Sequence, residues 1–328
     1  MKIKTREIKK IAIFRALQLG DLLCSVPAMR ALRKTFPKAN ITLIGLPWSK
    51  VLLDRFPQYL DSFICFSGYP GLPEQPFIPG KVISFLQEMQ HGQFDLALQM
   101  QGNGTIVNPM VELFGAKYTA GFCIKNDYCP DPELFLEYPE GISEIEKHIR
   151  LMNHLGIPSE GLHLEFPLTQ QDQDDFSRLN LPIEEKKYVC IHPGSRGSWR
   201  QWPPKYFASL ADYSISQGFP AVITGTKDEL PIVNEVMKQM KHPAVLAAGY
   251  TSLGAVGVLI SKAFALISNC TGVSHMASAF QTPGIVISMD GEPERWAPLN
   301  RTLHRTIDWT KTPDYQLVYK EAVDLLGK

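Results

Sequence analysis

A turn between an apolar run and a helix pattern is the first candidate binding site in the chain. From Ile267 to Ala279 the sequence passes from apolar residues into Thr271 and Gly272 and then resumes as a helix pattern. Unpaired backbone N–H groups and the positive end of the helix dipole bind anions in such a first turn without a metal. Thr271 and Ser274 would add hydroxyl donors, and Gly272 would let a ligand approach the backbone. The segment predicts a phosphate site, although a strand followed by a Thr-capped helix has the same pattern.

A second candidate loop combines glycines, a serine and arginines. Between Cys190 and Pro203 an apolar strand pattern runs into His-Pro-Gly-Ser, followed by Arg196 and Arg200. Guanidinium groups and loop amides suit phosphate oxygens, whereas a single loop arginine is more often only solvated. Two arginines beside one glycine turn favour the phosphate interpretation. Trp202 is expected to anchor the following helix by packing.

Asp21 is the candidate proton acceptor. It follows Gly20 where the first apolar run turns into a helix, so its carboxylate would lie at the carboxyl edge of a sheet. There it would take a proton from a hydroxyl held within hydrogen-bond reach. The alternative is a helix N-cap, which is worth about 1 kcal/mol. Because the turn has one glycine, it lacks the G-x-G-x-x-G pattern and predicts no dinucleotide site.

Two further positions have both a functional and a structural interpretation. Glu229 follows Asp228 after a strand and a glycine turn, where nucleotide-binding folds commonly hold the ribose hydroxyls. Either carboxylate would also stabilise a helix by complementing its dipole. His275, one turn into the helix after Thr271, would donate to a ligand or complete the helix entry.

Short apolar runs alternate with amphipathic stretches along the chain, which predicts an α/β protein with parallel sheets covered by helices. In the first half, strands are expected at 11–14, 41–46, 63–66 and 94–100, and helices at 22–36, 81–90 and 107–114. In the second half, strands are expected at 188–192, 221–224, 245–248, 265–268 and 284–288, and helices at 205–217, 229–240, 253–262 and after Thr271. Prolines and glycines make 69–80 a loop.

The polar, carboxylate-rich stretch 169–185 predicts a boundary between two doubly wound domains, 1–168 and 169–328. Ligands of such sheets bind beyond the carboxyl ends of the strands, and with two halves they are expected in the cleft between them. The last helix, 314–326, would stay with the second domain or return to pack on the first.

Composition excludes several classes of protein. The 328 residues are 45% hydrophobic, and 33 lysines and arginines balance 33 aspartates and glutamates, so no global field would hold nucleic acid or an anionic membrane. The apolar run after the basic start is too short for a signal peptide, and no run would span a bilayer. The six cysteines form no CxxC pair. They are expected to be reduced and mostly buried in a cytoplasmic protein that holds no metal and no cofactor.

Four motifs, in this order and spacing, resemble glycosyltransferase family 9, whose best-known members are the ADP-heptose:lipopolysaccharide heptosyltransferases. They are the glycine-aspartate turn at Asp21, His-Pro-Gly-Ser with its downstream Trp-Pro, the Gly-x-x-x-Glu turn ending at Glu229, and Thr-Gly-Val-Ser-His from Thr271. The likeness covers most of the chain. It implies a GT-B fold, in which two Rossmann-like domains face a central cleft, with the acceptor on the first and the sugar nucleotide on the second. It also implies an inverting, metal-independent transfer.

The resemblance assigns roles to individual residues. Asp21 matches the catalytic base, and Arg200 stands where the family usually carries a lysine, so its charge would stabilise the departing diphosphate. Cys270 occupies the position of an aspartate that approaches the donor sugar, and a thiol is a poor acceptor, which leaves the sugar open. With Arg196 from the loop, the residues expected to bind the donor are Gln18, Ser195, Arg196, Glu229, Thr251, Cys270, Thr271, Gly272, Val273 and His275.

The sequence therefore predicts an inverting glycosyltransferase that moves heptose or a related sugar from an ADP-heptose-like donor to a hydroxyl of a glycan or lipopolysaccharide-type acceptor. A lipid-linked acceptor would bring the enzyme transiently to the inner face of a membrane. Two alternatives remain. One is a nucleotide-sugar binding protein without turnover, suggested by Cys270 and Arg200, and the other is a GT-B enzyme that epimerises or hydrolyses its sugar nucleotide.

Overall fold

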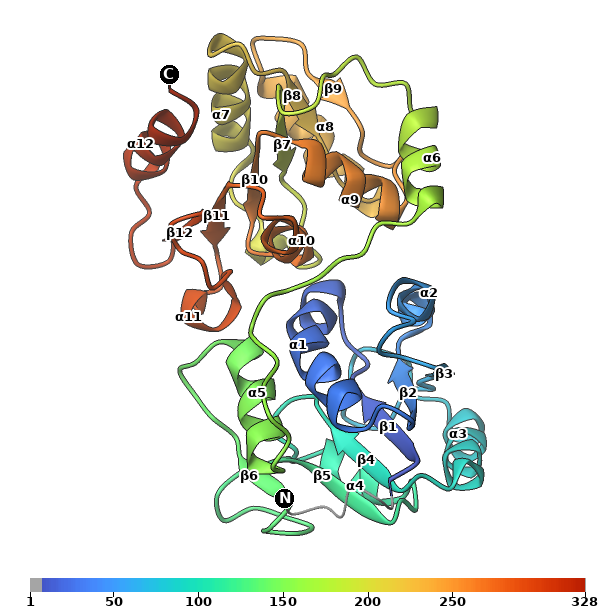
Figure 1. Ribbon diagram of the computed structural model, residues 1–328. Helices are drawn as coiled ribbons and strands as arrows, with labels where there is room; N and C mark the ends of the chain where they lie inside the picture. Colours follow the sequence, from blue (N-terminus) through green and yellow to red (C-terminus); the bar gives the residue numbers. More distant parts are fainter. Residues whose placement is uncertain (1–7, 328) are drawn as a thin grey trace. The chain divides into compact units, whose positions relative to one another are not determined.

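Two compact units make up the chain, Met1–His163 and Leu164–Lys328. The structure is a computed structural model that describes residues 8–327. Each unit contains one six-stranded sheet whose paired strands are parallel, with helices on both faces (Figure 1). The division falls after residue 163 rather than after 168, and Thr169 instead caps the first helix of the second unit.

The first sheet has the strand order β3-β2-β1-β4-β5-β6. Its strands are β1 (Lys10–Phe14), β2 (Asn40–Gly45), β3 (Ser62–Cys65), β4 (Leu96–Gln99), β5 (Tyr118–Cys123) and β6 (Phe135–Glu137). The helices of this unit are α1 (Leu19–Thr35), α2 (Val51–Arg55), α3 (Pro79–Gly92), α4 (Val107–Glu112) and α5 (Glu144–His154), with a 3-10 turn at Pro47–Lys50. The strand order reverses between β1 and β4, which is the topological switch point where ligands of such sheets bind.

The central strand of this unit is buried on both faces, which explains its uninterrupted apolar sequence. Because side chains alternate along a strand, Ala12 and Phe14 point to one face, where they join a core with Phe85 and Met89 of α3. The ring of Phe14 meets that of Phe66 edge-on, with centroids 5.1 Å apart. Helices α1 and α5 pack against each other.

The second sheet has the order β12-β11-β10-β7-β8-β9, with its switch point between β7 and β10. Its strands are β7 (Val189–His192), β8 (Ala221–Ile223), β9 (Val245–Leu246), β10 (Ala265–Asn269), β11 (Gly284–Ser288) and β12 (His304–Asp308). The helices are α6 (Gln170–Arg178), α7 (Pro204–Ser216), α8 (Leu230–Gln239), α9 (Leu253–Lys262), α10 (Gly272–Phe280), α11 (Pro293–Trp296) and α12 (Tyr315–Leu326), with 3-10 turns at Ser198–Arg200 and Lys227–Glu229.

The core of the second unit includes the last helix of the chain. Val318, Ala322 and Leu326 of α12 are buried together with residues of β7, α7 and α8. Of the two placements that the sequence left open for this helix, the structure has the one within the second unit's own core. Trp202 is fully buried there, with Trp309 edge-on at 5.3 Å between ring centroids, so its expected packing role is confirmed.

The predicted elements are present, most of them with shifted ends, and several elements were not predicted. Helix α1 begins at Leu19 rather than at Leu22, and α3 begins at Pro79, within the predicted loop. Among the helices and strands of residues 8–327, the prediction lacked β5, β6 and β12 and the helices α2, α5, α6 and α11. Helix α6 lies in the stretch expected to be a linker, because its sequence, QQDQDDFSR, has only one apolar residue to signal a helix face.

The cysteines were expected to be reduced and mostly buried, and all six are free in the structure. Cys24, Cys123, Cys190 and Cys270 are buried, whereas Cys65 is exposed. Within residues 8–327, none of the helices combines the length and the apolar character that a membrane crossing requires.

Candidate functional site

In both units, polar residues gather at the carboxyl edge of the sheet, beside the switch point. In the first unit the segments after β1 and β4 are joined by a hydrogen bond of 2.8 Å from the backbone N–H of Ala16 to Oε1 of Gln101. In the second unit the segments after β7 and β10 lie side by side, because β7 and β10 are neighbours in the sheet. The predicted base and the predicted phosphate loops therefore stand where ligands of doubly wound sheets bind.

Asp21 lies in the first turn of α1, at its third residue. Gln18 is the N-cap, and its backbone N–H donates to Oδ2 of Asp21 over 3.3 Å, so the two residues form a capping box. The alternative that Asp21 is itself the N-cap is therefore wrong, and Gly20 belongs to the helix rather than to a turn before it. The Asp21 side chain is 20% exposed. Its carboxylate thus accepts a hydrogen bond at one oxygen and is partly accessible to solvent.

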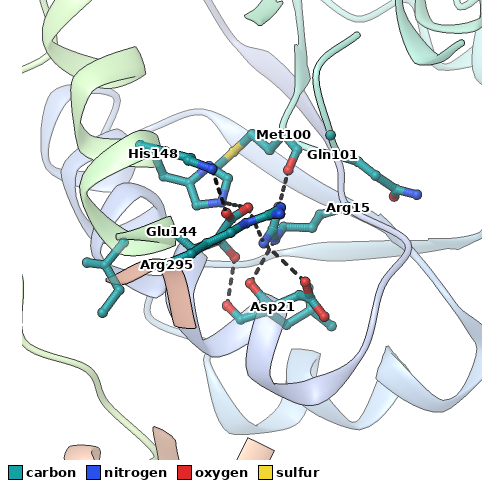
Figure 2. Close-up of polar contacts among 12 residues, drawn as sticks. Arg15, Asp21, Met100, Gln101, Glu144, His148 and Arg295 are labelled. Atoms are coloured by element: carbon teal, nitrogen blue, oxygen red, sulfur yellow. Dashed lines mark hydrogen bonds and ion pairs between the residues drawn. The ribbon is translucent and has the colours of Figure 1, made fainter. Parts of the chain in front are cut away.

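Arg15 lies next to this carboxylate (Figure 2). Its Nε donates to the backbone carbonyl of Asp21 over 2.7 Å, and its Nη2 lies 3.8 Å from Oδ1 of Asp21. The Arg15 side chain is fully buried, whereas the Asp21 carboxylate is not. No role was predicted for Arg15, which directly follows the apolar run 11–14 in the sequence.

Asn269 fixes the loop that follows β7. Its side chain accepts a hydrogen bond from the backbone N–H of Trp202 over 2.9 Å and donates to the carbonyl oxygens of Pro193 and Gly194 over 2.8 and 3.2 Å. It is fully buried at the end of β10. One amide thus joins both ends of loop 193–202 to the strand that leads into α10. The sequence analysis missed this residue, although an amide at the end of a buried strand is itself a signal.

Arg200 is held at this loop by a second residue that the sequence analysis missed. Its Nη2 forms an ion pair with Oδ2 of Asp290, and it lies 3.5 Å from the carbonyl oxygen of Cys270. Asp290 follows β11, has only 6% of its side chain exposed, and accepts a hydrogen bond of 2.7 Å from the hydroxyl of Ser288. The guanidinium predicted to bind phosphate is thus oriented by a nearly buried carboxylate.

Cys270 is a neutral thiol beside this ion pair. Burial and, to a smaller extent, the charge of Asp290 raise the pKa of Cys270 to about 12, against the opposing effects of Arg200 and Arg301. The side chain is 4% exposed. Position 270 therefore carries no charge at neutral pH, and the carboxylate close to it is that of Asp290.

The start of α10 has the predicted geometry, with one correction. Thr271 is the extended N-cap and Gly272 the first helical residue, and both are partly exposed. The hydroxyl of Ser274 donates over 2.7 Å to the carbonyl oxygen of Thr271, and Ser274 is fully buried, so the prediction that it donates to a ligand is wrong. Val273 and His275 are 7% and 3% exposed. The Thr271 hydroxyl donates over 3.4 Å to the carbonyl oxygen of Asn269. The first turn can therefore offer mainly its backbone N–H groups to an anion.

Of the two roles that the sequence left open for Glu229, the structure shows the capping role, and the ribose contact stays a prediction. Its Oε2 accepts a hydrogen bond of 2.8 Å from the backbone N–H of Thr226, which caps the 3-10 turn Lys227–Glu229. The same oxygen lies 3.7 Å from Nε2 of His192 at the end of β7. Burial lowers the pKa of His192, against the opposing effect of Glu229. The capping carboxylate therefore also lies at the loop that contains Ser195.

The remaining residues predicted to bind the sugar nucleotide lie in several separate parts of the structure. Ser195 is 6% exposed, and its carbonyl oxygen accepts from Nε2 of Gln201 over 2.9 Å. Arg196 is exposed. Thr251 follows β9 at the edge of the sheet, with β8 between β9 and β7. Gln18 lies in the first unit. Across residues 8–327, no three His, Cys, Asp or Glu side chains are grouped in a way that would hold a metal ion.

Comparison with known proteins is consistent with this arrangement. Residues 82–320 match the model of the family described as glycosyltransferase family 9 (heptosyltransferase). The chain is 23% identical to lipooligosaccharide heptosyltransferase 2 of Haemophilus ducreyi over 89% of this chain and 86% of that protein. It is 22% identical to lipopolysaccharide heptosyltransferase 2 of Escherichia coli K12, with the same coverage.

Two solved structures have the same fold. A family 9 glycosyl transferase from Veillonella parvula superimposes with a TM-score of 0.79 at 20% identity, over 99% of both chains. The E. coli ADP-heptose lps heptosyltransferase II superimposes with a TM-score of 0.75 at 20% identity, over 97% of this chain and 98% of that one. The predicted α/β fold of the GT-B class is thus confirmed, and the protein belongs to glycosyltransferase family 9 and is a glycosyltransferase.

Proposed function

We propose that the protein transfers heptose or a closely related sugar from a nucleoside-diphosphate donor to a hydroxyl group of a lipopolysaccharide-type acceptor, with inversion and without a metal ion. The observation that carries this proposal is the grouping of Arg200, the first turn of α10 and the Ser195 loop at the switch point of the second unit. These groups supply the positive charge and N–H donors that a departing diphosphate requires.

The reaction is a single displacement. Asp21 accepts the proton of the acceptor hydroxyl, and that oxygen attacks the anomeric carbon on the face opposite the diphosphate. The bond from the anomeric carbon to the diphosphate oxygen breaks, and the electron pair leaves with the nucleoside diphosphate. Arg200 and the amides of Thr271 and Gly272 stabilise the charge that develops there. One displacement inverts the anomeric configuration.

The identity of the substrates is inferred from the relatives. Their names specify heptose transfer to lipopolysaccharide or lipooligosaccharide, and one solved relative is an ADP-heptose enzyme. Because Cys270 stands in place of the family aspartate that approaches the donor sugar, the sugar that is transferred is heptose or a related one. A lipid-linked acceptor would place the working enzyme at the inner face of a membrane, in the cytoplasm.

The direct test combines ADP-heptose, heptose-deficient lipopolysaccharide and the purified full chain. We expect ADP release that requires acceptor, persists in EDTA, and gives a product of inverted anomeric configuration by NMR. Asp21→Ala is expected to abolish release while the affinity for ADP changes less than about threefold, because the base is not needed to hold the donor. ADP release without acceptor would indicate a hydrolase, and a new sugar nucleotide would indicate an epimerase. Calorimetric ADP binding without turnover on a panel of acceptors would indicate a binding protein.

A further inference from the structure

The guanidinium of Arg15 is fully buried in the first unit, and the reaction above gives it no role. A buried charge is costly unless it is paired and hydrogen-bonded, so its partners show what it is held for. Its Nη1 donates to the carbonyl oxygen of Met100, and its Nε donates to the carbonyl oxygen of Asp21. Its Nη2 lies 3.5 Å from Oε1 of Glu144 and 3.8 Å from Oδ1 of Asp21.

These partners come from three separate elements around the switch point, as Figure 2 shows. Asp21 belongs to the first turn of α1, Met100 follows β4, and Glu144 begins α5. Since the guanidinium is planar and its N–H groups point in fixed directions, one side chain can hold all three elements in a single arrangement. Lysine has one ammonium group on a flexible stem and cannot reproduce that fork.

The two carboxylates near Arg15 differ in their access to solvent. Glu144 is 4% exposed, and its Oε2 lies 3.4 Å from Nζ of Lys147, which is itself 3% exposed. The Nε2 of His148 lies 3.9 Å from Oε1 of Glu144. Asp21, by contrast, is 20% exposed. Glu144 therefore belongs to a buried cluster with Lys147 and His148. Of the two carboxylates, that of Asp21 is the one accessible to a substrate.

From this arrangement we infer that Arg15 is the positioning residue of the catalytic base: it fixes the main chain of Asp21 by a hydrogen bond and places its positive charge near the carboxylates of both Asp21 and Glu144. The inference rests on the proposed role of Asp21. Arg15 itself is buried and does not touch the substrate. Its loss would let the first turn of α1 move and would leave two carboxylates near each other without the cation beside them.

The test uses the full chain with ADP-heptose and heptose-deficient lipopolysaccharide, and compares Arg15→Met and Arg15→Lys with a matched control. The control is Arg33→Met. Arg33 lies in the last turn of α1. Like Arg15, it donates to two carbonyl oxygens, those of Ala39 and Tyr59, and pairs with a carboxylate, that of Asp61. It therefore has bonds of the same kind as Arg15 but lies twelve residues after Asp21, at the other end of the helix. All rates are measured below the melting temperature of each variant.

We expect Arg15→Met to lower kcat about 100-fold, the low end of what a general base contributes, while the donor KM and the ADP affinity change less than about threefold. Arg15→Lys is expected to restore part of kcat because it keeps the charge but not the fork. Arg33→Met is expected to lower the melting temperature with kcat within about twofold of the parent.

The outcomes separate this inference from the proposed function. If Asp21→Ala abolishes transfer and a folded Arg15→Met retains the parent kcat, the positioning role is overturned and the base remains. If Asp21→Ala retains the parent kcat, the base is wrong and the positioning role falls with it. If Arg15→Met does not fold, Arg15→Lys decides: an unchanged kcat overturns the inference, and a lowered kcat at constant donor KM supports it.

Discussion

Gly194 and Glu229 approach so closely that no side chain fits between them. A Cβ atom on Gly194 would lie 2.2 Å from Cδ of Glu229 and 2.3 Å from its Oε1. The glycine of the His-Pro-Gly-Ser motif thus leaves room for the Glu229 carboxyl group in its capping position. No unusual backbone angle is involved, because its φ lies outside the left-handed region. The contact places the capping carboxylate of Glu229 against the loop that contains Ser195 and Arg200.

Gly194→Ala is therefore expected to weaken nucleotide binding. The new methyl group would displace Glu229 or the loop, and we expect the dissociation constant for ADP to rise about tenfold, which corresponds to about 1.4 kcal/mol. Isothermal titration calorimetry measures this directly. Gly80→Ala is the control, since a Cβ there meets nothing within 4 Å. Equal ADP affinity in Gly194→Ala and the parent would show that the placement of Glu229 does not matter to the nucleotide.

Asn269→Ala should destabilise the second unit and loosen its loop. The substitution leaves the N–H of Trp202 and the carbonyl oxygens of Pro193 and Gly194 without their partner. Leaving buried polar groups unpaired costs about 1–3 kcal/mol, so we expect the free energy of unfolding to fall by about 2 kcal/mol. Urea denaturation and ADP titration check both effects. Asn234→Ala, at an exposed position of α8, is expected to change neither.

Arg200→Met should slow the chemical step. If the guanidinium stabilises the departing diphosphate, its removal is expected to lower kcat by about 100- to 1000-fold, and Arg200→Lys by about tenfold, because the charge survives without the planar fork. Steady-state rates of ADP release measure the difference. Arg178→Met, which removes an arginine that is 67% exposed and paired with Asp175, serves as the control. A kcat for Arg200→Met within threefold of the parent would contradict the role.

Stability should fall as the pH is lowered from neutral, and His304 should contribute to that loss. Burial lowers the pKa of His304 to about 4, and its side chain is fully buried. Between about pH 6.5 and 4 the unfolded state therefore binds a proton at His304 that the folded state excludes, so the free energy of unfolding decreases with falling pH. His192, whose pKa burial also lowers, adds an effect of the same sign.

His304→Leu is expected to flatten this dependence, by at most about 1.4 kcal/mol per pH unit within that window. Urea denaturation at several pH values between 7 and 4 measures the slope. The exposed His242 offers the comparison His242→Leu, which should leave the slope unchanged. An identical slope in His304→Leu and the parent would show that His304 does not link folding to protons.

Helices and strands with a clear apolar pattern could be predicted from the sequence. Helix α9 and strand β11 have the predicted bounds, because each is a mostly apolar segment between clear turn residues. Short edge strands such as β6 gave too little periodicity, and the polar α6 resembled a linker. The fold class was predictable from alternation alone, whereas these elements depend on tertiary contacts.

The candidate site was predictable only in its local parts. Asp21, the Ser195 loop and the start of α10 each stand at a break in a pattern that one stretch of sequence reveals. Asn269, Asp290 and Arg15 act across the sheet edge, on partners far away in the sequence such as Pro193, Arg200 and Glu144. A single sequence does not state which strands are neighbours, so these residues had no pattern that would mark them.

The place of α12 limits how this enzyme can be rearranged. Since Val318, Ala322 and Leu326 close one side of the second unit's interior, a chimera that borrows nucleotide specificity from a relative must take the whole stretch from 164 to the final helix. A graft that stopped at β12 would lack α12 and would expose the apolar core residues that this helix covers. We expect such a hybrid to be poorly soluble. The segment to exchange in such a chimera is thus the entire second unit, Leu164–Lys328.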